Sequence, residues 1–316
     1  MPVLLFGGAT IGGRTFTTAE DTNALLDALK ACKINHLDTA AVYPLTNPGA
    51  SERLIGGAKA GEKGFVIDTK IKIRKEGPKH ESLKKEAIDD SVANSLESLG
   101  VSQVNVLYCH TPDTVTPIEE TAAALHDHVS KGHCKEIGIS NYTAKGVEEL
   151  LSVCDKNGWT KPTVYQGQYN AVCRKRETEL LPLLRKHGIK FYAYSPLAGG
   201  FLTGNLSTGN DVTNTRYSST NPSSPFWKKM YDKEAMNAAI KDLHTYLQPH
   251  NISLPEASLR WLCHHSALGP EDGLILGATK TSQLEQNVAD VEKGPLSEEV
   301  VGMFEKVWER VKDVAP

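Results

Sequence analysis

Short apolar runs alternate with longer amphipathic stretches along the whole chain. Eight runs have the composition of strands buried on both faces, and they are Val3–Gly8, His36–Ala40, Phe65–Ile71, Val104–His110, Lys135–Ser140, Val164–Tyr169, Lys190–Pro196 and Gly273–Ala278. The stretches between them show the three- and four-residue steps of helices, as in Ser82–Leu99, which ends at the C-cap Gly100. Eight strand–helix units favour a closed (β/α)8 TIM barrel over a doubly wound open sheet, and we expect residues 1–316 to form one such domain.

Two segments fall outside this eightfold alternation. The polar stretch Ala198–Lys229 follows the seventh predicted strand and is far longer than an ordinary strand-to-helix connection. Connections of that length are usually functional or disordered, and this one would lie over the rim where the strands end. The second segment, Ser297–Val311, has one apolar face and Ser297 as N-cap, which predicts an extra helix packed on the outside of the barrel.

Composition excludes several classes of function. With 40% hydrophobic and 23% charged residues among 316, the chain has ordinary globular composition and enough length for a large core. A formal net charge of −3 argues against a nucleic-acid or polybasic membrane partner, although a local basic pocket for a phosphate stays open. No apolar stretch reaches the length of a membrane span, and the N-terminus lacks a basic signal region. We expect a soluble cytoplasmic protein, and the sequence leaves a homodimer open.

Cysteines and clustered histidines are the residues to test for metal binding. The six cysteines are scattered without Cys-x-x-Cys spacing, which indicates reduced thiols rather than a disulfide framework or a zinc site. His126 and His128, with His133 and Cys134 close behind, form the best cluster. Positions two apart do not share a helix face, so we predict no metal here. His264 and His265 are interpreted as the C-terminal end of a helix.

Four residues with acid–base side chains end, or lie just past, predicted strands. They are Asp38, Tyr43, Lys70 and His110, and parallel strands would bring them to one rim of the barrel. Reduction of a carbonyl needs a hydride at carbon and a proton at oxygen, and a phenol is a poor acid at neutral pH unless a nearby cation lowers its pKa. We predict that Lys70 is that cation, that Asp38 holds it, that His110 orients the carbonyl oxygen and that Tyr43 delivers the proton.

Ordered motifs along nearly the whole chain resemble the aldo-keto reductases. The motifs are Asp38–Tyr43, Ser51–Gly56, Asp68–Lys70, His110–Asp113, Gly138–Asn141 and Gln166–Asn170. Within that family the chain is most similar to the aflatoxin-aldehyde reductase branch, which reduces dialdehydes and succinic semialdehyde, and this similarity lies in Tyr165–Ala171, Arg174, Glu177–Leu180 and Ser195–Gly204. The resemblance implies an NADP-dependent aldehyde reductase whose catalytic tetrad is the four residues named above. Two departures are Ser195, where the branch commonly has Asn, and Asn205, where it often has Lys.

The expected cofactor is NADPH/NADP+, held without a Rossmann turn. The glycines of Gly7–Gly13 have the wrong spacing for that turn. The resemblance implies that the nicotinamide carboxamide is bound by Ser140, Asn141 and Gln166 and that Tyr194 stacks on the nicotinamide ring. It also implies a pyrophosphate site formed by Ser195, Leu197 and Gly199. It also implies an adenosine site at a helix N-terminus, formed by Gly277, Thr279, Lys280, Gln283, Gln286 and Asn287. Because a helix N-terminus suits a phosphate and Lys280 adds charge, we expect a moderate preference for NADPH over NADH.

Substrate contacts are expected from the long segment after the seventh strand. Arg216 is able to take a substrate carboxylate in a bidentate pair, while Tyr217 and Trp227 form an apolar lid over a small-molecule carbonyl. A rival hypothesis is a cofactor-sensing regulatory subunit resembling the channel β-subunits, which an intact tetrad does not exclude. A third is an aldolase that uses Lys70 as a Schiff-base nucleophile, which needs a depressed lysine pKa rather than an ion pair with Asp38.

Overall fold

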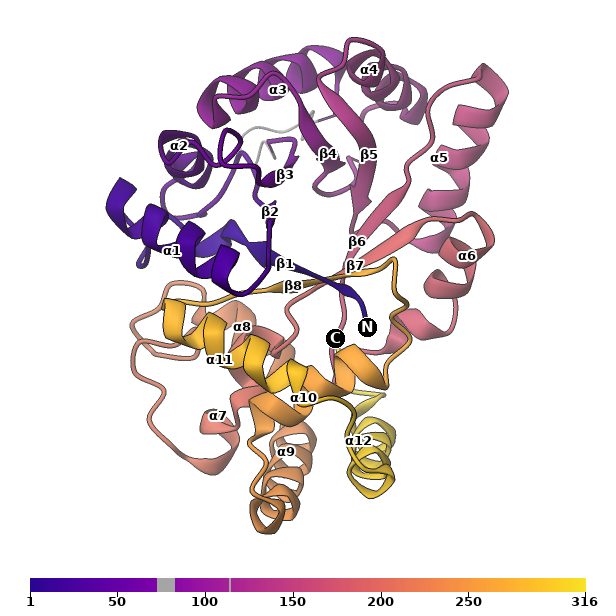
Figure 1. The fold of residues 1–316 in the computed structure, drawn as a ribbon. Helices are drawn as coiled ribbons and strands as arrows, with labels where there is room; N and C mark the ends of the chain where they lie inside the picture. Colours follow the sequence, from indigo (N-terminus) through magenta and orange to yellow (C-terminus); the bar gives the residue numbers. More distant parts are fainter. Residues whose placement is uncertain (73–82, 114) are drawn as a thin grey trace.

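Eight parallel strands close into a barrel in the computed structural model, which describes residues 1–72, 83–113 and 115–316. The strands pair with their sequence neighbours, and the first also pairs with the last (Figure 1). They are β1 (Val3–Gly7), β2 (His36–Asp38), β3 (Val66–Lys70), β4 (Val104–Cys109), β5 (Cys134–Ser140), β6 (Val164–Gln168), β7 (Lys190–Tyr194) and β8 (Gly273–Leu276). The predicted (β/α)8 TIM barrel is confirmed.

The predicted strands run one or two residues too far at seven of their eight carboxyl ends. At β7, for example, Ser195 has a φ of 57° and so leaves the extended conformation. Pro196 then has no N–H with which to continue the ladder. The apolar pattern persists past the last paired residue, because the chain is still buried where it turns over the rim.

Helices surround the barrel on its outside (Figure 1). They are α1 (Ala19–Ala31), α2 (Ala50–Gly57), α3 (Lys85–Leu99), α4 (Ile118–Ser130), α5 (Ala144–Asn157), α6 (Leu180–Lys186), α7 (Asn205–Thr208), α8 (Ser224–Tyr231), α9 (Glu234–Leu247), α10 (Leu254–His264), α11 (Thr281–Glu292) and α12 (Glu298–Val311). The helix expected over Ser82–Leu99 is α3; its predicted first residue lies outside the described residues, and Gly100 caps it in the left-handed conformation, at φ 65°. The predicted C-terminal helix is α12, whose N-cap Ser297 accepts from the Val300 N–H. No helix in the described ranges is long and apolar enough to cross a membrane.

Tyrosine rings fill the barrel below its rim. Tyr108 and Tyr192 pack inside it with a small set of aliphatic side chains, apart from the larger core between strands and helices. Glycine is required on the neighbouring strands: a Cβ on Gly138 would lie 2.2 Å from the Tyr108 ring, and one on Gly273 would lie 2.7 Å from the Tyr192 ring. These rings form a packed floor under the polar side chains at the strand ends.

The long segment after β7 is partly helical and is anchored to the rim. It contains the 3-10 helix η3 (Ala198–Thr203) as well as α7 and α8. Tyr231 of α8 is buried, accepts hydrogen bonds from Asn170 and Gln168, and stacks between Phe201 and Trp227. This segment, residues 198–231, is held against β6 by Tyr231, and we call it the cover segment.

Candidate active site

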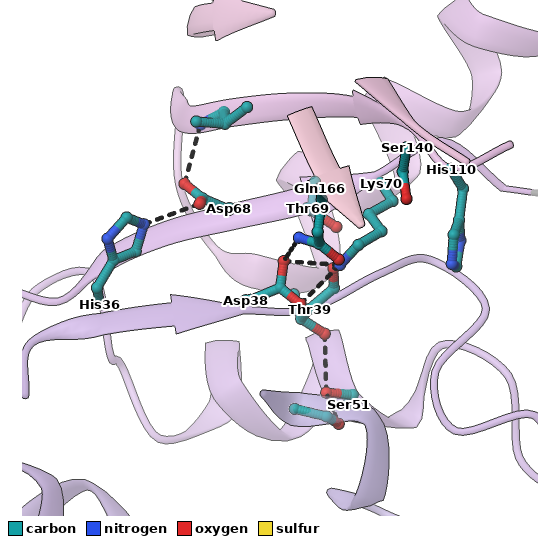
Figure 2. A network of polar contacts seen from close by, with 12 residues as sticks. His36, Asp38, Thr39, Ser51, Asp68, Thr69, Lys70, His110, Ser140 and Gln166 are labelled. Carbon is teal, nitrogen blue, oxygen red and sulfur yellow. Dashed lines mark hydrogen bonds and ion pairs between the residues drawn. The ribbon is translucent and has the colours of Figure 1, made fainter. Parts of the chain in front are cut away.

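A buried ion pair joins β2 and β3 at the rim. The Lys70 Nζ lies 2.7 Å from each carboxylate oxygen of Asp38, and the two side chains are 0% and 4% exposed. The ammonium also donates to the Thr39 carbonyl at 2.8 Å, and Gln166 Nε2 donates to Asp38 Oδ1 at 2.8 Å. Figure 2 shows the side chains of Asp38, Lys70 and Gln166 converging, with His110 beyond them. The donors and acceptors of this pair come from β2, β3 and β6 and from the residue after β2, which the barrel brings together.

The surroundings of the pair keep Lys70 charged. Burial by itself would lower the pKa of Lys70, but the charges of Asp38, Tyr43 and Asp68 outweigh it and raise this pKa above its usual value. Burial raises the pKa of Asp38, against the lowering effect of Lys70. A lysine with a raised pKa is a poor amine nucleophile, so the aldolase hypothesis does not fit this site.

Tyr43 and His110 complete the tetrad beside the ammonium. The Lys70 Nζ lies 5.1 Å from the centre of the Tyr43 ring, and the Tyr43 and His110 rings meet edge to face at 5.5 Å. Burial raises the pKa of Tyr43, while Lys70 and Arg216 lower it by less. The expectation of a net depressed phenol pKa is therefore wrong, although Lys70 acts in the expected direction. Burial is the largest contribution to this shift.

Helix α2 fixes the backbone that holds Lys70. Ser51 Oγ donates to the Gly8 carbonyl at 2.9 Å and lies 2.8 Å from Thr39 Oγ1, so it ties β2 to β1 next to the Thr39 carbonyl (Figure 2). Its neighbour Glu52 is buried and accepts a hydrogen bond from Thr69 at 2.6 Å. Thr69 is the strand residue immediately before Lys70. From the sequence, these two residues were predicted only as part of a family motif. Their signal was a polar pair, Ser51-Glu52, at the start of an otherwise apolar helix face.

A second polar layer lies deeper in the barrel than the tetrad. Asp68 accepts from Asn105 at 2.9 Å and lies 2.8 Å from His36 Nε2 (Figure 2). Still nearer the amino ends of the strands, Lys190 lies 3.1 Å from Glu136. Because side chains on a strand alternate between faces, Glu136 shares the interior face with Gly138, which is packed against Tyr108. No role was predicted for these groups from the sequence.

The predicted carboxamide residues lie at the end of β5 and in the middle of β6, close to the ion pair. Asn141 has a φ of 63° and donates to the His110 carbonyl and to Ser140 Oγ, both at 3.0 Å. Tyr194, predicted to stack on the ring, donates from its hydroxyl to Asn141 Oδ1 at 3.1 Å. Gln166 comes from the next strand and reaches Asp38. The barrel thus brings the predicted carboxamide residues and the ring-stacking residue together beside the tetrad.

The predicted pyrophosphate residues form a tight turn after β7. Gly199 has a φ of 66°, and a Cβ there would lie 2.4 Å from the Trp227 ring. Leu197 immediately precedes η3, and Ser195 stands in the left-handed region, where Asn is better tolerated than Ser. Glycine is required at position 199 because α8 covers this turn.

The predicted adenosine residues divide between two places. Lys280 is the exposed N-cap of α11 and makes no capping hydrogen bond with its side chain, while Thr279 donates to Gln283 Oε1 at 2.9 Å. Gly277 is exposed just before this turn, and Asn287 is one turn along the helix from Gln283. Gln286 instead donates to Asp290 and lines a shallow groove with Lys293. The structure therefore gives Gln286 a partner away from the helix N-terminus.

The three predicted substrate residues have different surroundings. The Arg216 guanidinium lies 4.6 Å from the centre of the Trp227 ring, and burial lowers its pKa against the opposing effect of nearby tyrosines, Tyr43 among them. No carboxylate within the described ranges pairs with Arg216. Tyr217, by contrast, is 2% exposed and donates to the Ala198 carbonyl at 2.9 Å. Its prediction as a substrate contact does not fit, because its hydroxyl is used to hold the cover segment together.

The histidine cluster has the geometry of hydrogen bonds. His126 Nδ1 contacts Thr160, while His128 Nδ1 lies 2.8 Å from His133 Nδ1 and its other ring nitrogen faces Asp89. Two zinc ligands with bonds of about 2.0–2.1 Å stand further apart than that in a tetrahedral site. Within the described residues no group of three or more His, Cys, Asp or Glu side chains is arranged to hold a metal. The six cysteines are free thiols, as predicted.

Comparison with known proteins identifies one family. Residues 3–309 match the model of the Aldo/keto reductase family. Aflatoxin B1 aldehyde reductase member 2 of Mus musculus is 39% identical, over 89% of this chain and 78% of its own length. Aldo-keto reductase family 7 member A3 of Homo sapiens is 36% identical over 100% of this chain and 96% of its own. An aldo-keto reductase of Pseudocercospora fijiensis is 39% identical over 91% and 97% of the two chains.

Proposed function

Since the chain belongs to the aldo/keto reductase family, we propose that it reduces aldehydes to alcohols with NADPH, with Tyr43 as general acid. One observation carries the proposal most directly. A fully buried ammonium, that of Lys70, is held by Asp38 and stands 5.1 Å from the Tyr43 ring. A cation so placed stabilises the phenolate that forms when Tyr43 gives up its proton.

The residues of the site divide the proton chemistry among them. Bound dihydronicotinamide supplies the hydride to the carbonyl carbon. Tyr43 donates its hydroxyl proton to the carbonyl oxygen, and His110 beside it orients that oxygen. The raised pKa of Tyr43 keeps the phenol protonated at neutral pH. The developing alkoxide resembles hydroxide and is a much stronger base than a phenolate, so it takes this proton.

The residues at the rim fit a nicotinamide cofactor. Ser140, Asn141 and Gln166 present amide and hydroxyl groups beside Lys70, as a carboxamide requires. At the far side, α11 offers free N–H groups and a positive dipole at its first turn, where Lys280 is exposed. Lys280 would hold the 2′-phosphate of NADPH, with Thr279 and Gln283 adding hydrogen bonds.

The surroundings of Arg216 favour an aldehyde that carries a carboxylate. This arginine has no carboxylate partner within the described ranges, and its charge acts on Tyr43. The guanidinium is able to donate two parallel hydrogen bonds to a substrate carboxylate, and Trp227 forms an apolar wall beside it. An aldehyde with an acidic end would therefore bind with its carbonyl directed toward Tyr43.

The test is NADPH oxidation by the purified protein against succinic semialdehyde and a nitrobenzaldehyde. We expect turnover of both, and Arg216→Met should raise KM for succinic semialdehyde while leaving KM for the nitrobenzaldehyde nearly unchanged. Equal effects on the two substrates would contradict the carboxylate role of Arg216. Tight NADPH binding without turnover of any aldehyde would contradict the reductase proposal and favour a cofactor-sensing regulatory subunit.

A further inference from the structure

Gln166 occupies a position that its expected role alone does not explain. It is the third residue of β6, 3% exposed, and its Nε2 donates to Asp38 Oδ1 at 2.8 Å. That oxygen also accepts from Lys70 at 2.7 Å. Figure 2 shows the amide of Gln166 lying against the Asp38–Lys70 pair. A side chain expected to bind the cofactor is thus already bonded to the catalytic ion pair.

The chemistry of Asp38 determines which end of the amide faces it. An ionised carboxylate has lone pairs and no hydrogen, so only the NH2 end of Gln166 can bond to it. The carbonyl end, Oε1, is therefore turned away from Asp38, and it can act only as an acceptor. A carboxamide NH2 group matches that acceptor. If Asp38 were protonated, it could donate to Oε1 instead, and the amide would turn its NH2 end outward.

We propose that Gln166 is a positioning residue that couples nicotinamide binding to the ionised form of Asp38. The inference rests on the proposed function, since the nicotinamide carboxamide is the group that meets Oε1. An N–H donor at Oε1 polarises the amide and strengthens the bond from Nε2 to Asp38. Ionised Asp38 in turn holds Lys70 as an ammonium. By linkage, the form of Asp38 that favours catalysis is also the form that binds the cofactor better.

The coupling has a defined direction. Burial raises the pKa of Asp38 most, Lys70 lowers it, the charge of Asp68 raises it, and the hydrogen bond from Gln166 lowers it. Cofactor binding should therefore lower the pKa of Asp38 further. Conversely, cofactor affinity should fall as the pH drops through the pKa of Asp38, because the protonated carboxyl no longer fixes the amide.

The experiment follows the Asp38 carboxyl carbon by NMR in protein labelled with 13C-aspartate, with and without NADP+. The signal is assigned by its loss in Asp38→Asn. In Gln166→Met, we expect the pKa of Asp38 to rise in the cofactor-free protein and to lose its response to NADP+. We expect affinity for NADP+ to fall about five- to tenfold, as for the loss of one hydrogen bond.

Ser140→Ala is the matched control, because Ser140 is a predicted carboxamide contact with no hydrogen bond to Asp38. It should weaken NADP+ binding yet leave the titration of Asp38 in the cofactor-free protein as in the wild type. A Gln166→Met protein with weaker binding and an unchanged Asp38 titration would overturn the coupling and leave the proposed function intact.

Two further outcomes are separated by the same measurements. If the wild-type protein does not bind NADP+, the proposed function fails, and so does the response of Asp38 to the cofactor; the titration of cofactor-free Gln166→Met then tests the hydrogen bond alone. If Gln166→Met does not fold, Gln166→Asn replaces it, since a shorter amide cannot reach both Asp38 and the cofactor. An unchanged Asp38 titration in Gln166→Asn would overturn the proposal as well.

Discussion

Two lysine–carboxylate pairs stand inside the same barrel, one at each end, and they behave differently. At the carboxyl rim, Lys70 and Asp38 are 0% and 4% exposed and 2.7 Å apart. Near the amino ends of the strands, Lys190 and Glu136 are 32% and 29% exposed and 3.1 Å apart. The pair at the carboxyl rim is buried, whereas the second pair is partly exposed to solvent.

The difference in burial makes the pKa values of the two carboxyl groups shift in opposite directions. Burial raises the pKa of Asp38 and is not fully offset by Lys70. At Glu136 burial acts in the same direction, but hydrogen bonds from Thr163 and Lys190 outweigh it, and the pKa of Glu136 is lowered. The two lysine–carboxylate pairs therefore differ in character: the buried one is the proposed catalytic pair, and the other is a partly solvated ion pair.

The largest loss of turnover is expected on substitution of Tyr43, the proposed acid beside the Lys70–Asp38 pair. Tyr43→Phe removes the transferable proton and should cut turnover by something on the order of 10²–10⁴, while NADPH affinity changes little. Steady-state kinetics and fluorescence titration measure the two effects. Retention of more than half of the wild-type rate would remove Tyr43 from the mechanism.

Breaking each pair in turn tests whether only one is catalytic. Lys70→Met removes the cation beside Tyr43 and should lower turnover on the order of 10²–10⁴ as well. Lys190→Met is the matched control, because it removes the lysine of the solvent-exposed pair and should leave turnover close to the wild-type value. Equal losses in the two variants would show that damage to the barrel, rather than lost chemistry, explains the effect of Lys70→Met.

Lys280, an exposed lysine outside the barrel, is a third lysine to compare with Lys70 and Lys190, and its predicted effect is on cofactor affinity. Lys280→Met should raise the dissociation constant for NADPH by about ten- to a hundredfold, because the variant loses a charge at a helix N-terminus. Binding of NADH, which lacks the 2′-phosphate, should be little changed. Equal weakening for both cofactors, in fluorescence titrations, would mean that another residue sets the preference.

The smallest effect, on the free energy of unfolding, is expected from the partly exposed pair of Lys190 and Glu136. A carboxyl whose folded-state pKa is lowered contributes stability above its unfolded pKa, and this is lost as the pH falls through the folded pKa. Glu136→Gln should therefore cost roughly 1 kcal/mol or less at neutral pH, as for partly exposed pairs. Its free energy of unfolding should also fall less than that of the wild type between neutral pH and about pH 3.5. Urea unfolding at the two pH values measures this; a wild-type-like loss in the variant would contradict the assignment.

The site residues were predictable to the extent that each one ends an apolar run. Asp38, Lys70 and His110 follow buried strand residues, and Tyr43 lies in the turn after one, so parallel strands had to bring them to one rim. Their partners were less visible. Gln166 was expected to bind only the cofactor, and Tyr217 was expected to face a substrate, because sequence distance does not show which polar groups become buried together.

The alternation of apolar runs and amphipathic stretches indicated the closed barrel, since burial of both strand faces leaves few other arrangements, and the ordered motifs indicated the family. Only the tertiary structure decided the electrostatics. Asp38 and Gln166 are 128 positions apart, and the segment that carries Arg216 is folded back over Tyr43. The direction of a pKa shift depends on all the atoms that exclude water from a group. For Tyr43, burial outweighed the effect of the neighbouring cation that the sequence had pointed to.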